Sequence, residues 1–384
     1  MSGIHIFQKS FKYLTNHVRS TIENLDRSKL LRIFEILIQT RKDQESNINR
    51  MIIVDGQGRS LQSLLLTEDC LEHNGFNIIL PVSNANLRPW KTGDVFIFNT
   101  GSGSGSPLTH ARAAKDNGLH VIGMSYNPEM GKEFENVLIL RRTVNRNKQL
   151  APLGTEFEIA SAIIGVCLAY SIKDTAEESL HEFERSTSKI IKLYEATYDY
   201  LEEEVESLMA FINIISEYVP AENQNKVYFL GVGRNEIINR IAAIRYGHLH
   251  KEPSYDITVI YEGHWDLRQK DDLAIVLSGS GATSQTLTFA NQAFISGMRI
   301  FGVTSFQESD LANFTKRVDG CLVLPGREDF VSMYNQPVHR RHNYFPAFEL
   351  NTYITFDALL AQIAYNFKIK EEDMKASHRP KILE

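Results

Sequence analysis

Two loops rich in Ser and Gly carry the side chains of this sequence that could bind an anion. One is residues 277–284 (LSGSGATS) and the other residues 99–106 (NTGSGSGS). Each follows a short apolar run typical of a buried strand and precedes an amphipathic segment typical of a helix. Glycine lets the backbone approach a ligand closely, and the free N–H groups at the positive end of a helix face it. The pattern predicts a phosphate site in each loop.

Two Gly-rich turns, residues 56–58 and 231–233, also follow apolar runs. They do not match the dinucleotide fingerprint GxGxxG, because Leu61 and Glu236 stand where its third glycine would be, so we do not expect NAD. The arginines after the turns, Arg59 and Arg234, are either surface residues or lie over the ligand.

Two carboxylates occupy similar places, because Glu158 and Glu349 each stand at the start of an apolar helical segment. A carboxylate there could simply favour the helix dipole. It could also be a base that removes a proton alpha to a carbonyl. Spacing does not rank the histidines that could donate a proton, which are His110, His264, His339, His342 and, in the polar C-terminal segment, His378.

These features recur at a nearly constant interval, which indicates an internal duplication. The Gly-rich turns are 175 residues apart, the Ser loops 178 and the two glutamates 191. Because the interval is longer for the glutamates than for the features before them, we expect an insertion in the second unit, within residues 326–344. We expect two units, residues 1–185 and 186–384.

Strands that alternate with helices predict a parallel, helix-covered sheet in each unit. A helical pair is expected first, in residues 4–48 and again in 190–219, with a helical linker at 173–185. The expected strands are residues 51–54, 77–80, 95–98, 119–124 and 137–140 in the first unit, and 227–230, 257–261, 273–277, 298–303 and 321–324 in the second.

Composition narrows the class of protein. A net charge of −6 argues against a nucleic-acid binder. The three cysteines are far apart and form no metal-ligand pattern, so we expect buried thiols and no metal. The apolar run 159–172 is shorter than the ~20 residues that span a bilayer, which favours a core helix. Without a signal-peptide pattern, we expect a soluble, cytoplasmic protein with no membrane partner.

These motifs together resemble the sugar isomerase (SIS) domain, and more narrowly the 6-phospho-3-hexuloisomerases. The matching stretches are residues 56–60 (GQGRS), 152–158 (PLGTEFE), 278–283 (SGSGAT), 324–326 (LPG) and 371–378 (EEDMKASH). The resemblance covers nearly the whole chain as two SIS units. It implies two flavodoxin-like three-layer units, each a five-stranded parallel sheet flanked by helices, packed as a pseudo-dimer.

The resemblance also implies roles for residues. Glu349 or Glu158 would move a proton between C2 and C3 of a sugar phosphate through a 2,3-enediolate, and His378 would donate a proton. No metal or redox cofactor is implied. The implied substrate-binding residues are Gly58, Arg59, Ser60, Ser102 with Ser104 or Ser106, Gly233, Arg234, Ser278, Ser280 and Thr283.

The chain departs from the family pattern in ways that leave alternatives open. Gly105 stands where the first loop would have Thr, and residues 345–349 (FPAFE) replace the second LGTxFE, so the two sites need not be equivalent. The expected reaction interconverts 3-hexulose 6-phosphate and fructose 6-phosphate. The alternatives are a non-catalytic sugar-phosphate sensor, a phosphoglucose/phosphomannose isomerase or a sugar-amine deglycase. The absence of an N-terminal amidotransferase domain disfavours an aminotransferase. Whether two fused chains form a homodimer is left open.

Overall fold

Two five-stranded parallel sheets form the framework of the protein. The computed structural model describes residues 3–77, 79–83, 88–141, 146–220, 223, 225–249, 259–260, 268–328 and 345–377. The first sheet has the order β2-β1-β3-β4-β5 and the second the order β10-β9-β8-β6-β7. The strands are β1 (Ile52–Gly56), β2 (Ile79–Pro81), β3 (Val95–Thr100), β4 (His120–Ser125), β5 (Asn136–Ile139), β6 (Val227–Leu230), β7 (Val259–Ile260), β8 (Leu273–Leu277), β9 (Arg299–Thr304) and β10 (Cys321–Val323).

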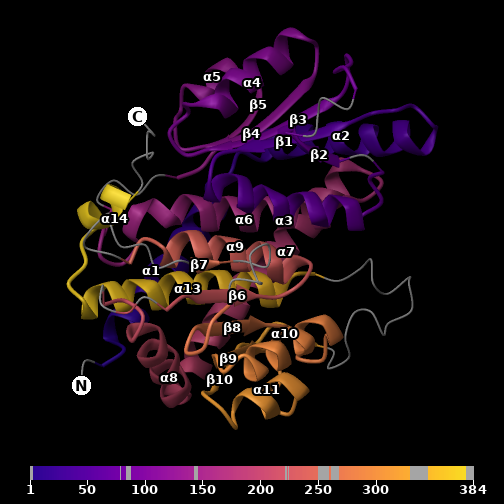
Figure 1. Cartoon of the computed structure of the whole chain (residues 1–384). Helices are drawn as coiled ribbons and strands as arrows, with labels where there is room; N and C mark the ends of the chain where they lie inside the picture. Colours follow the sequence, from indigo (N-terminus) through magenta and orange to yellow (C-terminus); the bar gives the residue numbers. More distant parts are fainter. Residues whose placement is uncertain are drawn as a thin grey trace, which may run out of the picture.

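Helices cover both faces of each sheet. Those of the first unit are α1 (His5–Glu23), α2 (Arg27–Glu45), α3 (Arg59–His73), α4 (Ser106–Asp116), α5 (Met130–Glu133) and α6 (Thr155–Tyr170). Those of the second are α7 (Ala176–Glu203), α8 (Val205–Ser216), α9 (Arg234–Tyr246), α10 (Ser284–Ile295), α11 (Asp310–Thr315), α13 (Ala347–Asn366) and α14 (Glu371–Ser377). In Figure 1, α3, α6, α9 and α13 lie between the sheets, and α4, α5, α10 and α11 lie outside. The predicted fold, two helix-flanked parallel sheets, is confirmed.

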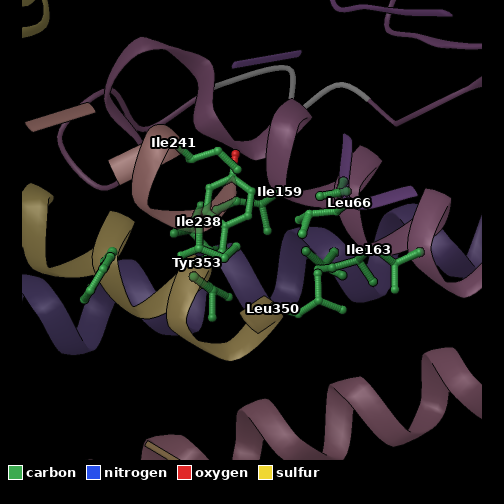
Figure 2. Close-up of a cluster of buried hydrophobic side chains, with 14 of the residues drawn as sticks. Leu66, Ile159, Ile163, Ile238, Ile241, Leu350 and Tyr353 are labelled. Carbon is green, nitrogen blue, oxygen red and sulfur yellow. The ribbon is translucent and has the colours of Figure 1, made fainter. Parts of the chain in front are cut away.

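One apolar core joins the two units. In β1, Ile52 and Val54 point into this central core, whereas Ile53, together with Met51 just before the strand, points into a smaller core under α4. Parallel strands buried on both faces need such continuous apolar runs. Figure 2 shows part of the central core, where side chains from both units pack together: Leu66, Ile159 and Ile163 from the first, and Ile238, Ile241, Leu350 and Tyr353 from the second.

The connection between the units is a single long helix. The predicted linker and the first predicted helix after it are continuous in α7, because residues 176–203 contain no Gly or Pro. Thr175 caps the helix, accepting a hydrogen bond from the backbone N–H of Glu178 at 3.2 Å. The predicted boundary at residues 185/186 falls within this helix.

Four further expectations concern the apolar segment, the cysteines, the insertion and the C-terminal segment. The segment Pro152–Tyr170 is long and apolar enough to cross a membrane, but 78% of it is buried inside the protein, as in a core helix. The three cysteines are buried and free. Most of the predicted insertion, residues 329–344, lies outside the described residues. The start of the expected polar C-terminal segment forms α14.

Candidate active site

Both units turn from their first strand into a helix at a glycine. Gly58 at the start of α3 has φ 54° and ψ −124°, and Gly233 at the start of α9 has φ 60° and ψ −132°. Residues with side chains rarely adopt these angles, so both positions require glycine. The same turn therefore occurs at the carboxyl end of the first strand in each unit.

The Ser loop of the first unit is open to solvent. Ser102, Ser104 and Ser106 are all exposed, and they lie between the end of β3 and the first turn of α4. The Ser102 and Ser104 hydroxyl oxygens are 2.6 Å apart. Gln57, in the Gly-rich turn, donates to Ser106 Oγ at 3.0 Å, so the two loops touch. Hydroxyl groups and the N-terminus of α4 thus present donors together at the sheet edge.

The start of α6 packs against this loop. A Cβ atom on Gly101 would lie 3.2 Å from the ring of Phe157, so the loop lies close to the residue before Glu158. Asn99, at the end of β3, donates to the Ser60 carbonyl at 3.2 Å and to Ser161 Oγ at 2.9 Å. The β1–α3 turn, the Ser loop and the first turn of α6 therefore meet. In open parallel sheets, ligands bind in the crevice at this edge, where strand order reverses, here between β1 and β3.

Glu158 is a nearly buried carboxylate at this junction. Its side chain is 14% exposed, and its Oε2 lies 3.5 Å from Arg59 Nη2. Burial raises the pKa of the Glu158 carboxyl above its ordinary value, and the guanidinium groups of Arg59 and Arg245 oppose part of that rise. A carboxylate with a raised pKa accepts and returns a proton more readily near neutral pH than an ordinary one.

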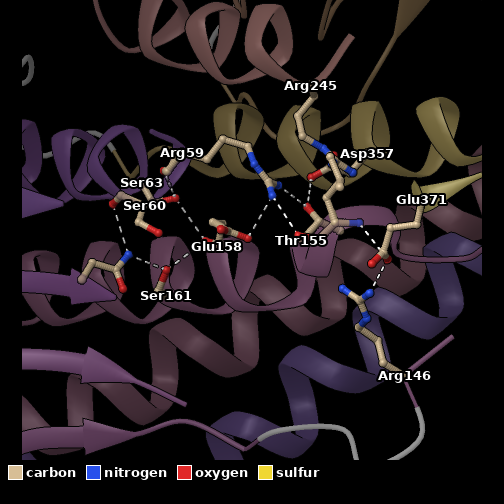
Figure 3. A network of polar contacts seen from close by, with 12 residues as sticks. Arg59, Ser60, Ser63, Arg146, Thr155, Glu158, Ser161, Arg245, Asp357 and Glu371 are labelled. Carbon is tan, nitrogen blue, oxygen red and sulfur yellow. Dashed lines mark hydrogen bonds and ion pairs between the residues drawn. The ribbon is translucent and has the colours of Figure 1, made fainter. Parts of the chain in front are cut away.

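Arg59 is held by groups of its own unit, one of which contacts a carboxylate of the second unit (Figure 3). Its Nη1 donates to Thr155 Oγ1 at 3.2 Å, and its Nη2 donates to the Leu153 carbonyl at 3.2 Å. Thr155 donates in turn to Asp357 of α13 at 2.5 Å, and Asp357 also accepts from Arg245 Nε of α9 at 2.5 Å. Arg245 and Asp357 belong to the second unit, so polar side chains of both units surround Glu158.

The equivalent loop in the second unit is closed. Ser278 and Ser280 are 1% and 3% exposed. Their hydroxyl groups accept from the loop's own backbone, Ser278 from Gly281 N–H at 3.1 Å and Ser280 from Ala282 N–H at 3.2 Å. Thr283 Oγ1 lies 3.2 Å from the Ser278 hydroxyl. Ser278 and Ser280 are therefore buried within their own loop, whereas the three serines of the first loop are exposed to solvent.

The second unit's counterparts of Glu158 and Arg59 are Glu349 and Arg234, and both are buried. Glu349 is 2% exposed and follows Phe348, whose ring lies 2.9 Å from where a Cβ atom of Gly279 would be. Arg234 forms an ion pair with Asp69 of α3, in the first unit. Arg59 and Arg234 are 6% and 4% exposed, so neither is a surface residue.

Among the candidate histidines, only His110 lies within the described residues. His378 and the three candidates His264, His339 and His342 lie outside them. His110 Nδ1 is 2.8 Å from Asp55 Oδ2, beside the first loop. Within the described part of the chain, no group of three or more His, Cys, Asp or Glu side chains has a metal-binding arrangement.

Sequence reasoning missed Asp357, Arg245, Asp69 and Asp55. The one available signal was Asp357, the only charged residue between Glu349 and Lys368. A charge is rarely buried unless it is paired, so such an isolated acid indicates an unseen cation. Its partner, Arg245, lies 112 residues away and could not be identified from spacing.

No protein-family model matches the chain. Curated relatives match parts of it. A 3-hexulose-6-phosphate isomerase of Methylomonas aminofaciens is 27% identical over 157 residues, 40% of this chain and 78% of the relative. An uncharacterised protein of Archaeoglobus fulgidus is 25% identical over 44% of this chain and 98% of its own length. A 3-hexulose-6-phosphate isomerase of Methanocaldococcus jannaschii is 38% identical over 18% of this chain and 36% of its own length.

Solved structures match both units together. A candidate phosphosugar isomerase of Clostridium difficile matches with a TM-score of 0.63 and 10% identity, over 97% of this chain and 95% of that one. The C-terminal domain of glucosamine-fructose-6-phosphate aminotransferase from Francisella tularensis matches with a TM-score of 0.54 and 15% identity, over 94% and 97% of the two chains. At these identities the likeness establishes the fold. The chain is thus a two-unit protein with the fold of the SIS-type phosphosugar isomerases, and in sequence it resembles 3-hexulose-6-phosphate isomerases.

Proposed function

We propose that this protein is a sugar-phosphate isomerase that interconverts 3-hexulose 6-phosphate and fructose 6-phosphate in the first unit's site. The observation that carries the proposal is the packing of the exposed Ser loop, residues 102–106, against the start of α6, the helix that carries the buried carboxylate of Glu158. The choice of sugar rests on the relatives at 27% and 38% identity. We further propose that the enzyme acts in the cytoplasm, with a sugar phosphate as its ligand.

The proposed reaction needs one base and a set of hydrogen-bond donors. Glu158 takes the proton from C2 of the 3-ketose, and the electron pair of that C–H bond forms the C2=C3 double bond as O3 gains negative charge. The proton of the O2 hydroxyl passes to O3. Return of a proton from Glu158 to C3, as the C2 carbonyl forms, gives the 2-ketose. The step balances without an oxidant or reductant, so the proposal includes no redox cofactor.

Turnover in deuterated water tests this proposal. NMR would follow 3-hexulose 6-phosphate, fructose 6-phosphate, glucose 6-phosphate and mannose 6-phosphate with EDTA present. Interconversion of the two ketoses with deuterium at C2 or C3 supports the named reaction. Aldose formation would instead favour a phosphoglucose/phosphomannose isomerase. Saturable binding of one sugar without turnover of any would support the sensor and exclude the enzyme.

The two Ser loops should differ in their effect on substrate affinity. We expect Ser102→Ala with Ser104→Ala to raise KM by at least about tenfold, because each hydrogen bond to a charged phosphate contributes about 1.5–3 kcal/mol. The matched pair Ser278→Ala with Ser280→Ala should leave KM nearly unchanged, since those hydroxyl groups bind their own loop. Equal effects from the two pairs, in steady-state kinetics, would show that the second loop also binds substrate.

The pH dependence should reflect the buried base. The unprotonated form of Glu158 is the active one, and its fraction grows as pH rises through the pKa of the folded protein. Because burial raises that pKa, the acid limb of kcat/KM should lie above the ordinary value for glutamate. A pH–rate profile checks this expectation. The pKa of the substrate phosphate is measured separately, so that its protonation is not mistaken for that of Glu158. An acid limb at or below the ordinary glutamate value would exclude Glu158 as the base.

A further inference from the structure

A buried relay of polar groups runs from the second unit to Glu158. Asp357 and Arg245 are 2% and 1% exposed, and their ion pair is the start of the relay. In the described part of the chain, the Arg245 Nη1 and Nη2 atoms have no hydrogen-bond partner. Asp357 therefore anchors this guanidinium, and a buried cation without that anchor would be costly.

The direction of hydrogen-bond donation along the relay follows from the single hydroxyl proton of Thr155. Thr155 has one hydroxyl proton, and it is donated to Asp357 Oδ2. The Thr155 oxygen can then only accept on its other side, where Arg59 Nη1 donates to it at 3.2 Å. This leaves Arg59 Nη2 facing Glu158. A carboxylate in one unit thus determines how an arginine in the other approaches the base (Figure 3).

The second site lacks these groups at the corresponding positions. Applying the interval of 191 residues, Thr155 corresponds to Pro346 and Asp357 to Val166. With the interval of 175, Arg245 corresponds to Cys70. Pro346 has no hydroxyl group and Val166 has no charge, so these counterparts cannot reproduce the relay around Glu349.

We propose that Asp357 is a positioning residue for the first site, holding Arg59 against Glu158 through Thr155, so that this site is complete only when both units are present. The role assigned to Glu158 rests on the proposed function. The relay itself rests on contacts between the two units.

The charges around Glu158 predict what the loss of Asp357 would do. Arg59 of α3 and Arg245 of α9 favour the carboxylate, whereas Asp357 and Tyr353 of α13 and Glu156 of α6 itself oppose it. Asp357→Asn keeps the size of the side chain and removes one negative charge. It also leaves the Arg245 charge unneutralised. By charge alone, both changes favour ionised Glu158. Release of Arg59 acts the other way, because a guanidinium that moves off the carboxylate no longer lowers its pKa. Asp357→Asn therefore combines two opposing effects, and the test needs a variant that keeps every charge.

The first test titrates Glu158 itself without substrate. In protein labelled with carboxyl-13C glutamate, the signal that Glu158→Gln removes is assigned to Glu158. We expect its midpoint to move to higher pH in Thr155→Val, which keeps every charge but breaks the link from Asp357 to Arg59. We expect it to stay in place in Thr155→Ser, which keeps the hydroxyl group. An unchanged midpoint in a folded Thr155→Val protein would overturn the proposal. Because no substrate is used, this result does not depend on whether the isomerase reaction is found.

The second test uses the hydroxyl at the centre of the relay and requires no charge change. Thr155→Val should lower kcat roughly tenfold with little change in KM, about the effect of one lost hydrogen bond, and Thr155→Ser should restore it. Loss in both variants, or in neither, would contradict positioning through the hydroxyl group. Circular dichroism and thermal unfolding confirm that each variant is folded. If the isomerase is inactive, the Glu158 midpoint in Thr155→Val and Thr155→Ser gives the same comparison.

Discussion

Glu158→Gln should reduce turnover by about 10²–10⁴-fold while sugar-phosphate binding is retained. The amide has nearly the shape of the carboxylate but cannot take a proton, and this range is the usual contribution of a general base. Binding should persist because the proposed phosphate contacts lie in the separate loop at residues 102–106. Turnover is measured by NMR and binding by calorimetry with the same ketose.

Glu349→Gln is the matched variant in the second unit. We expect it to keep most of the turnover, because Glu349 lies beside a loop whose hydroxyl groups bind their own backbone. An equal loss in the two variants would show that the sites work together, and a loss in Glu349→Gln alone would show that the second site is the active one. No loss in either variant, with binding intact, would leave the sensor as the function.

Breaking the ion pair between Arg245 and Asp357 should cost the most stability. Asp357→Leu would leave the Arg245 guanidinium buried without its carboxylate, and removing one partner of a buried pair costs about 3–5 kcal/mol. Arg245→Met combined with Asp357→Leu should recover most of this loss, because the apolar pair needs no neutralising partner. Urea unfolding gives the free energies.

A surface pair provides the control for this comparison. Arg112 and Glu133 also form an ion pair, with side chains 56% and 29% exposed. Glu133→Gln should change the free energy of unfolding by at most about 1 kcal/mol, since solvent screens exposed pairs. If the Asp357 variant were no less stable than this control, burial of the pair would not make it more important for stability than an exposed pair.

The elements that local pattern defines were predictable from the sequence. Apolar runs bounded by glycine identified the strands of both sheets, since a strand buried on both faces must be apolar throughout. The repeated spacing of Gly58 and Gly233 indicated two units, because both turns need a backbone that only glycine adopts readily. The continuity of α7 was less visible, since the sequence there suggested a linker followed by a separate helix.

Contacts between distant residues could not be predicted. Arg234 pairs with Asp69 and Arg245 with Asp357, and these partners are 165 and 112 residues apart. Nothing in a local pattern identifies which acid a buried arginine will meet. The difference between the two Ser loops was also hidden, because burial of Ser278 depends on what surrounds the loop and hardly on its own residues.

The shared central core has a consequence for how such a protein can diverge. In a symmetric dimer of two separate chains, any substitution appears at both sites, because the same residue occupies both positions. In this fused chain the two halves of the interface mutate independently. Pro346 can therefore occupy the position in the second unit that corresponds to Thr155, without any change to the first site. In the same way, Val166 occupies the position in the first unit that corresponds to Asp357. One half can lose the features of a reaction centre and still be retained, because the other half cannot bury its apolar face alone.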